Sequence, residues 1–392
     1  MSMQNTNLKS QFLLNPDITY LNFGSFGACP RPIFEEYQKY QLELESEPVR
    51  FIAVNGLEYL KKSRQALAQY INCNADDLVY TTNPSYAVNI IAKSFKLNAG
   101  DEILSTNLEY GALDRTWNYY CRKAGAKYVR QPIRLPLVSK EQFIEDFFKG
   151  LTAKTKAIFI SQITSTTALI FPVKEICEIA KSKGLFTIVD GAHVPGHIPL
   201  TLAELKADVY VGACHKWMCA PKGCAFLYVK KEFQNLFDPL VISWGYESAF
   251  PSGSQFLDYH QTQGTRDFSA FLTIPKVIQF LKKNNWTQVA ADCRKLTHSN
   301  YMRFCNLLGS QPLAHITDEF LGQMCSIRIN TPEPEKLHNY LFEKYSIEIP
   351  VMRQDNLVFI RYSINAFNSQ ADLDKLYNAL TEIIAKGELI KA

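Results

Sequence analysis

Two residues of opposite charge, Asp190 and Lys216, follow apolar segments that are typical of buried strands. Asp190 comes directly after residues 185–189, and Lys216 lies four residues after residues 209–212. Both therefore fall near the carboxyl edge of a predicted sheet, where open α/β folds bind their ligands. An ionised side chain beside apolar strands costs roughly several kcal/mol unless it is paired or has a function. The pair therefore indicates a site for chemistry.

The chemistry that suits both residues is that of a shared cofactor. A lysine in a partly dry site has its neutral amine favoured, and such an amine condenses with an aldehyde to form a Schiff base. Pyridoxal 5′-phosphate is an aldehyde whose pyridine nitrogen withdraws electrons best when protonated, and a buried aspartate would hold that proton. Asp190 and Lys216 then have complementary roles. In the alternative interpretation, Asp190 caps a turn and Lys216 is a surface lysine.

The motifs around this pair point to one family. The segments 190–193 (DGAH), 215–217 (HKW) and 221–223 (PKG) together resemble the class V aminotransferase family of pyridoxal-phosphate enzymes. Residues 109–117, EYGALDRTW, resemble its isopenicillin-N-epimerase-like branch. The resemblance covers about residues 18–385. It implies a fold type I pyridoxal-phosphate enzyme that works as a homodimer.

A phosphate site is expected where a helix begins after residue 83. Thr82, Asn83 and Ser85 precede an apolar helical run, and a helix amino terminus offers unpaired N–H groups and partial positive charge. A plain helix cap by Asn83 or Ser85 is the alternative. The resemblance favours phosphate binding and adds His215. The family often has serine at position 213, where this chain has Ala213, which leaves more of the task to Thr82 and His215.

The remaining cofactor contacts follow from the resemblance. It places Tyr110 over the pyridoxal ring and His193 close to the Schiff base, as a catalytic residue beside Lys216 and Asp190. It also places a side chain of the segment after residue 160 near the ring oxygen, and both Thr164 and Ser165 fit this role. Taken singly, a tyrosine or histidine more often packs or makes structural hydrogen bonds, and serine and threonine often cap turns.

Arg361 ends an apolar strand and could bind a carboxylate through two parallel hydrogen bonds. Read alone, it is as well suited to a structural ion pair. The resemblance assigns Arg361 and Asn22 to an amino-acid substrate. It also predicts that Gly264-Thr265 reaches the phosphate of the neighbouring subunit.

A fold in which strands and helices alternate along the chain would position these residues. Short apolar strands alternate with helices between residues 78 and 229, which predicts a mainly parallel, doubly wound sheet. Residues 19–32 predict an extended entry without regular structure, because of Gly24, Gly27 and two prolines. The expected elements are strands at 78–80, 102–105, 127–130, 157–160, 185–189, 209–212, 225–229, 324–329 and 357–361, with helices at 33–45, 55–70, from about 86, from about 112, 141–149, 173–183, 269–283, 286–308 and 369–386.

Three parts of the chain are expected. Residues 1–20 form an N-terminal arm, residues 21–262 a large cofactor-binding domain, and residues 263–392 a smaller α+β domain, with which the N-terminal residues could pack. This is an α/β fold overall.

Composition limits the partners. The chain has 392 residues, 47% hydrophobic and 20% charged, with a net charge of +4 and no dense basic block, so nucleic-acid binding is not expected. No apolar run of membrane-spanning length or signal sequence is visible, which predicts a cytoplasmic protein with no membrane partner. The ten cysteines predict free, mostly buried thiols, and the spacing of Cys214, Cys219 and Cys224 does not suit a metal site.

The predicted activity is that of an amino-acid epimerase or aminotransferase that removes an α-proton with Lys216. A C–S lyase is the alternative. A persulfide-forming desulfurase is disfavoured because residues 348–362 contain no cysteine to act as the nucleophile. A third hypothesis is a regulatory module that keeps the cofactor pocket without catalysis.

Overall fold

The computed structural model describes residues 8–391, and residues 1–7 of the predicted N-terminal arm lie outside it. Its centre is a sheet of seven strands in the order β2-β8-β7-β6-β5-β3-β4. β8 is antiparallel to both of its neighbours, and the remaining pairs are parallel. The predicted mainly parallel sheet is therefore confirmed. The strands are β2 (Leu78–Thr81), β3 (Glu102–Thr106), β4 (Lys127–Gln131), β5 (Thr155–Ser161), β6 (Phe186–Gly191), β7 (Val209–Ala213) and β8 (Ala225–Val229).

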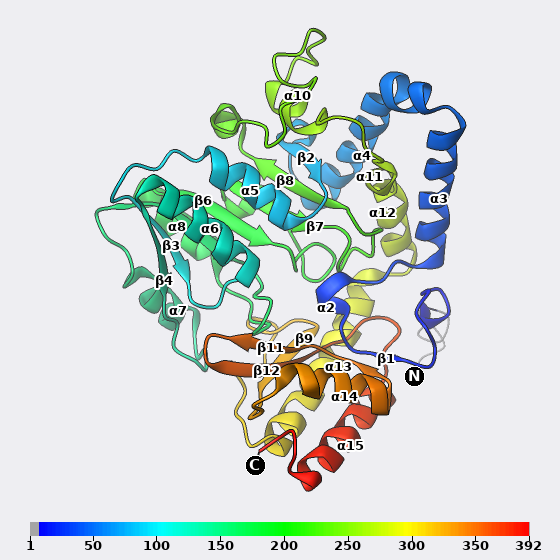
Figure 1. The fold of residues 1–392 in the computed structure, drawn as a ribbon, viewed down its shortest axis with the longest axis vertical. Coiled ribbons are helices and arrows are strands. Elements are labelled where there is room, and N and C mark those ends of the chain that lie inside the picture. The colour runs from blue at the N-terminus through cyan, green and yellow to red at the C-terminus, as the bar shows by residue number, and fades with distance from the viewer. Residues whose placement is uncertain (1–7, 392) are drawn as a thin grey trace.

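Helices cover both faces of this sheet, which explains why its inner strands are apolar on both sides (Figure 1). Successive strand residues enter different cores: Ile158 packs in one, and Phe159 packs in the other. One core is closed by α5 (Pro84–Ser94) and α6 (Gly111–Ala124). The other contains residues of α4 (Gly56–Ile71), α7 (Lys140–Phe148), α8 (Val173–Ser182) and α12 (Ile274–Lys283).

The C-terminal part is a smaller α+β domain. Its three-stranded antiparallel sheet has the order β11-β12-β9. Two of these strands, β11 (Val351–Gln354) and β12 (Leu357–Ser363), form a hairpin, and β11 was not predicted from the sequence. The other elements are α13 (Trp286–Leu307), β9 (Met324–Arg328), α14 (Pro334–Tyr345), β10 (Ile347–Glu348) and α15 (Gln370–Lys386).

The N-terminal segment joins the small domain. β1 (Thr19–Tyr20) pairs in parallel with β10, and the Phe12 ring lies 5.0 Å from that of Phe367. The expectation that residues 19–32 lack regular structure was wrong. A short helix, α2 (Phe23–Phe26), follows β1, because Phe23 is anchored between the Trp217 and Phe367 rings. α3 (Arg31–Ser46) begins directly after Pro30, with a proline in its first turn, and a π-helix at Arg50–Asn55 links it to α4.

The predicted helix at 269–283 is divided in two. α11 (Ser269–Leu272) and α12 meet at Thr273, because Pro275 stands in the first turn of α12 and cannot continue a preceding helix. Both pieces pack against α3 and α4, which belong to the N-terminal half of the chain. α9 (Leu202–Leu205) lies between β6 and β7, and α10 (Gln255–Gln261) lies in the connection between β8 and α11. The proposed domain boundary at residue 262 stays a prediction.

The cysteines are free thiols, eight of them buried and two half-buried, as the sequence predicted. Among residues 8–391, no helix combines the length and the apolar character needed to cross a membrane.

Candidate active site

A cavity of about 480 Å³ opens at the carboxyl edge of the central sheet. Its lining brings together side chains that are far apart in the sequence, including Asp190, His193 and Lys216. Thr82, Asn83, Ser85, Tyr110, Ser165 and His215 also line it. Most of the residues that the sequence assigned to the cofactor therefore share one cavity.

Asp190 lies within β6, one residue before the end of the strand, and only 4% of it is exposed. Burial raises the pKa of its carboxyl. The backbone N–H of Ala192, which donates to Oδ1 over 2.9 Å, and the charge of Lys216 act in the opposite direction. The carboxylate therefore has a backbone donor on one oxygen and faces a cavity that also contains a cation.

Lys216 is carried by the connection between β7 and β8. Because these strands are antiparallel neighbours, both ends of the connection are fixed in the same sheet, and the N–H groups of Cys214 and His215 donate to the carbonyl of Cys224 over 3.0 Å. Burial, partly opposed by Asp190, lowers the pKa of Lys216 from 10.5 to about 8. A larger fraction of this amine is therefore neutral than in an exposed lysine.

His193 lies between Lys216 and Trp217. Its Nε2 is 3.2 Å from Lys216 Nζ, and the indole Nε1 of Trp217 donates to its Nδ1 over 3.3 Å. Because an indole N–H can only donate, Nδ1 must accept, and a neutral His193 carries its proton on Nε2. Burial first, and then the charge of Lys216, hold the pKa of His193 well below its usual value. The imidazole is therefore neutral and presents Nε2–H to the lysine amine.

The expected phosphate end lies at the start of α5. Asn83 is the N-cap residue, and its Oδ1 accepts from the N–H of Tyr86 over 2.8 Å, so this side chain has the capping role that the sequence left open. Thr82 and Ser85, which flank this cap residue in the sequence, also line the cavity. His215 contributes a ring whose Nδ1 lies 2.9 Å from the Cys224 carbonyl, and burial lowers its pKa to about 4.

Thr164 and Ser165, which the sequence could not separate, have different surroundings. Thr164 is fully buried; its hydroxyl contacts that of Thr167 over 2.7 Å and accepts from the N–H of Leu169 over 2.9 Å. Ser165 lines the cavity. Ser165 is therefore the member of the pair that faces the cavity. Tyr110 also faces the cavity and is 46% exposed.

The two residues expected to bind substrate do not line the cavity, and Asn22 lines two other pockets instead. Arg361 is 1% exposed; it donates to the carbonyl of Ser165 and, over 3.1 Å, to the hydroxyl of Ser25. Its Nε is buried without a hydrogen-bond partner among the described residues. Asn22 donates to Glu348 over 2.8 Å. Two serines of the lining therefore separate the guanidinium from the cavity.

Gly264 and Thr265 are exposed and do not line the cavity within one chain. Their expected contact with a neighbouring subunit stays a prediction.

Sequence reasoning missed some residues of this region. Ser25 and Phe26 line the cavity from α2. Gly27, with φ 63°, permits this approach, because a side chain there would collide with the backbone of His215 and Lys216. Lys222 adds a cation from a motif that was noted only as part of the resemblance. Glu109 is fully buried beside Tyr110, and no sequence signal distinguished it.

The residues present fit pyridoxal 5′-phosphate. The cavity combines a buried amine of lowered pKa, a buried carboxylate, an exposed aromatic face and a helix start with hydroxyl groups. These are the partners required by an aldehyde, a pyridine nitrogen, a flat ring and a phosphate.

Comparison with known proteins agrees with this chemistry. The family model "Aminotransferase class-V" matches residues 21–376. The isopenicillin N epimerase of Streptomyces clavuligerus is 30% identical over 385 residues, which cover 95% of this chain and 96% of that protein. A probable chloroplastic L-cysteine desulfhydrase of Arabidopsis thaliana is 26% identical, covering 95% of this chain and 84% of that protein.

Among solved structures, the apo cysteine desulfurase of Thermococcus onnurineus NA1 has a TM-score of 0.81 at 19% identity, covering 97% of this chain and 98% of that chain. At this identity the likeness concerns the fold alone, and it confirms the fold type I architecture. With a family model that spans nearly the whole chain and a cavity whose donors suit the family's cofactor, this chain belongs to the class V aminotransferase family of pyridoxal 5′-phosphate enzymes.

Proposed function

We propose that this chain is an amino-acid epimerase or aminotransferase whose central step is removal of the substrate's α-proton by Lys216, with epimerisation as the leading assignment. The observation that carries the proposal is the contact between Lys216 Nζ and His193 Nε2, which are 3.2 Å apart in the cavity. Similarity to an isopenicillin N epimerase over nearly the full length supports the same reaction class. The physiological substrate is left open.

Several polar residues of the cavity have a role in this proposal. Thr82, Ser85 and His215 hold the phosphate, and Asp190 holds a proton on the pyridine nitrogen. When bound, pyridoxal 5′-phosphate supplies an aldehyde for the substrate amine and a ring that stores negative charge.

The substrate is bound from the other side of the cavity. The buried guanidinium of Arg361 and the amide of Asn22 receive its carboxylate once Ser25 and Ser165 give way. Burial of these groups excludes water, which strengthens every charge interaction within the site.

Lys216 accepts the α-proton, and His193 orients the amine that receives it. Because the pKa of Lys216 is lowered to about 8, its amine can accept the α-proton near neutral pH. His193 Nε2–H donates to that amine and fixes its direction. An epimerase must return the proton to the same carbon on the opposite face, whereas an aminotransferase delivers it to the cofactor carbon.

A C–S lyase is the second candidate, favoured by the similarity to a probable L-cysteine desulfhydrase. Persulfide transfer is less well supported. Within residues 8–391 no cysteine lines the cavity, and Cys325 is fully buried in β9 with its thiol pKa raised by burial. A thiol in that state is a poor nucleophile.

A homodimer in the cytoplasm is the assembly we propose. Besides Gly264-Thr265, the segment between β8 and α10 exposes large apolar side chains: Trp244 is 81% exposed and Phe250 is 88% exposed. Apolar residues gathered in one exposed segment are typical of a protein interface. Pairing of two chains there would bring Thr265 of one toward the phosphate site of the other.

One experiment separates these reactions. Purified holoenzyme is incubated with a panel of L-amino acids in heavy water, and α-deuterium exchange, D-isomer, keto acid and sulfide are followed together. D-isomer with deuterium supports epimerisation, keto acid supports transamination, and sulfide supports a lyase. If a broad panel gives none of these products, the proposal fails and a binding module without catalysis is favoured.

A further inference from the structure

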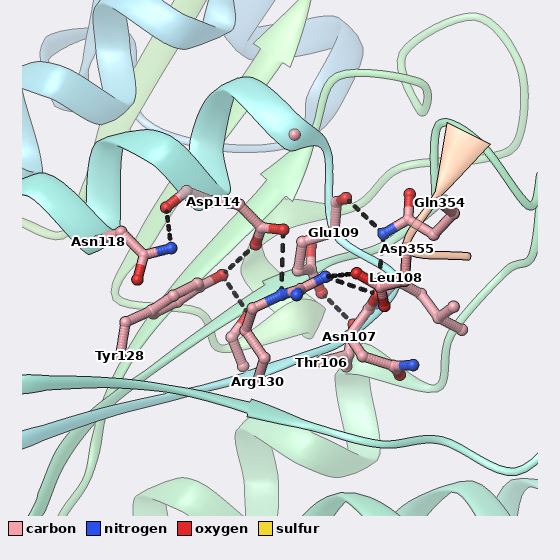
Figure 2. Close-up of polar contacts among 12 residues, drawn as sticks. Thr106, Asn107, Leu108, Glu109, Asp114, Asn118, Tyr128, Arg130, Gln354 and Asp355 are labelled. Atoms are coloured by element: carbon pink, nitrogen blue, oxygen red, sulfur yellow. Dashed lines mark hydrogen bonds and ion pairs between the residues drawn. The ribbon is translucent and has the colours of Figure 1, made fainter. Parts of the chain in front are cut away.

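The tip of the β11–β12 hairpin contacts the large domain at the segment that carries Tyr110 (Figure 2). Gln354 Nε2 donates to the carbonyl oxygen of Asn107 over 2.8 Å and lies 3.5 Å from that of Glu109. Asp355, in the turn of the hairpin, pairs with Arg130 over 3.1 Å. Gln354 of the small domain thus holds the backbone just before Tyr110, and Asp355 holds the neighbouring Arg130 side chain.

Arg130, in β4, connects this contact to Asp114, which follows Tyr110 in the chain (Figure 2). One guanidinium nitrogen, Nη2, donates to both Asp355 and the Asn107 carbonyl, the latter over 3.2 Å. Its Nε lies 3.2 Å from a carboxylate oxygen of Asp114, in the first turn of α6. The other oxygen of Asp114 accepts from the Tyr128 hydroxyl over 2.8 Å.

Tyr110 is therefore fixed from both sides. Its own carbonyl accepts from the N–H groups of Leu113 and Asp114 at the start of α6, while the carbonyls of Asn107 and Glu109 are held by Gln354. The ring itself remains exposed to the cavity. A change in the position of the β11–β12 hairpin would therefore be passed to the Tyr110 ring through the hydrogen bonds of Gln354.

The same hairpin carries Arg361. β12 runs from Leu357 to Ser363, and Arg361 lies one residue beyond its pairing with β11, where its N–H donates to the carbonyl of Pro350 over 3.2 Å. A strand pair hydrogen-bonded along its length moves as a unit. Movement of Arg361 toward a substrate would therefore move Gln354 and Asp355 as well.

We propose that Arg130, Gln354 and Asp355 form an interdomain clamp that positions Tyr110 over the cofactor ring and links it to the hairpin that carries Arg361. This inference rests on the proposed function, which assigns the ring contact to Tyr110 and the carboxylate to Arg361. The clamp residues touch neither substrate nor cofactor, so they are positioning residues.

The test uses the full-length holoenzyme with Gln354→Ala and Asp355→Asn combined. Asp355 has 49% of its side chain exposed, so the variant should fold. Amide hydrogen exchange is measured across residues 107–113, with the induced circular dichroism of the bound cofactor as a second signal. Losing one exposed ion pair and the two hydrogen bonds of Gln354 should speed local exchange roughly three- to tenfold. The dichroism should change, and KM should rise more than kcat falls.

Glu319→Gln is the matched control. It removes another ion pair, with Lys140 of α7 over 3.4 Å, at a similarly exposed side chain that does not contact residues 107–110. It should leave exchange and dichroism unchanged. Equal effects in both variants, or no effect in the clamp variant, would overturn the clamp. Failure of the proposed function is a separate result, because it requires that wild-type protein bind no cofactor or catalyse none of the expected reactions.

Discussion

Two buried carboxyl groups in the large domain, Asp190 and Glu109, have opposite surroundings. Asp190 is 4% exposed and Glu109 is fully buried. Burial raises the pKa of both, that of Glu109 to about 8. Asp190 faces a cavity and a lysine, whereas Glu109 is surrounded by hydroxyl and amide groups of Ser161 and the hydroxyl of Thr106.

The difference shows that burial of a carboxyl group does not by itself mark a functional site. With Lys216 nearby, Asp190 has a cation that favours its charged form. Burial raises the pKa of Glu109 more than the hydrogen bonds from Ser161 and Thr106 lower it, so Glu109 is protonated at neutral pH, where it links the end of β3 to the end of β5. A charged partner and an adjacent cavity, more than the depth of burial, distinguish a carboxyl group that can take part in chemistry from a structural one.

Removing the cation of the functional pair should have the largest effect. Lys216→Ala should lower the rate of α-deuterium exchange by about 10³- to 10⁴-fold, because the base for the proton is lost. Initial rates in heavy water measure this. Lys206→Ala, at an exposed amine paired with Glu178, is the control and should retain activity. A Lys216→Ala enzyme with more than a tenth of wild-type activity would contradict the assignment.

The two carboxyl groups should then differ clearly when each is replaced by its amide. Asp190→Asn should lower kcat/KM by roughly 10²- to 10³-fold, because an amide cannot hold a proton on the pyridine nitrogen. Glu109→Gln should change kcat/KM by less than about threefold, because a protonated acid and an amide have similar shape and donors. If the two losses were equal, the comparison would be wrong.

The pH dependence of the reactivity of Lys216 is a further test of the difference between Asp190 and Glu109. In the apoenzyme, modification of Lys216 by an amine-specific reagent should increase as pH rises through about 8, because only the neutral amine reacts. Asp190→Asn should move this midpoint to lower pH, since a negative neighbour that favours the ammonium is lost. Glu109→Gln should leave it in place. Mass spectrometry of the modified peptide gives the midpoint, and an unchanged value in Asp190→Asn would count against the pairing.

The smallest expected effect concerns stability. Glu109 has a folded-state pKa of about 8 against an ordinary 4.5, so the folded state binds an extra proton between these values. Its contribution to the free energy of unfolding is full below pH 4.5 and is lost as pH rises through about 8. Glu109→Gln should flatten this decline, which urea unfolding at a series of pH values would reveal. Equal slopes in both proteins would mean that Glu109 is ionised when folded.

Much of the sheet could be predicted, because its strands are short apolar runs between turn residues. Asp190 and Lys216 were found because the carboxyl ends of these strands meet at one edge. The hairpin strand β11 was missed because it is half-exposed and contains Arg353 and Gln354, which do not give a buried-strand pattern.

Contacts between distant segments could not be predicted from local patterns. The choice of Ser165 over Thr164 depends on a turn that closes through Thr167 and Leu169. α2 depends on Phe23 packing against Trp217, nearly two hundred positions later. The neutral state of Glu109 depends on its complete burial, which only the packed fold provides. Each of these features can be recognised only once the three-dimensional structure is known.

Because Trp217 contacts His193, which lines the cavity, the fluorescence of Trp217 can report on what occupies the cavity. The Trp217 indole stacks on His197 with ring centroids 4.0 Å apart and is fully buried, whereas Trp244 is exposed. Its emission therefore lies apart from that of a solvated indole, and a bound chromophore near Lys216 would quench it by energy transfer. Filling of the cavity could thus be timed in a stopped-flow fluorimeter without any label.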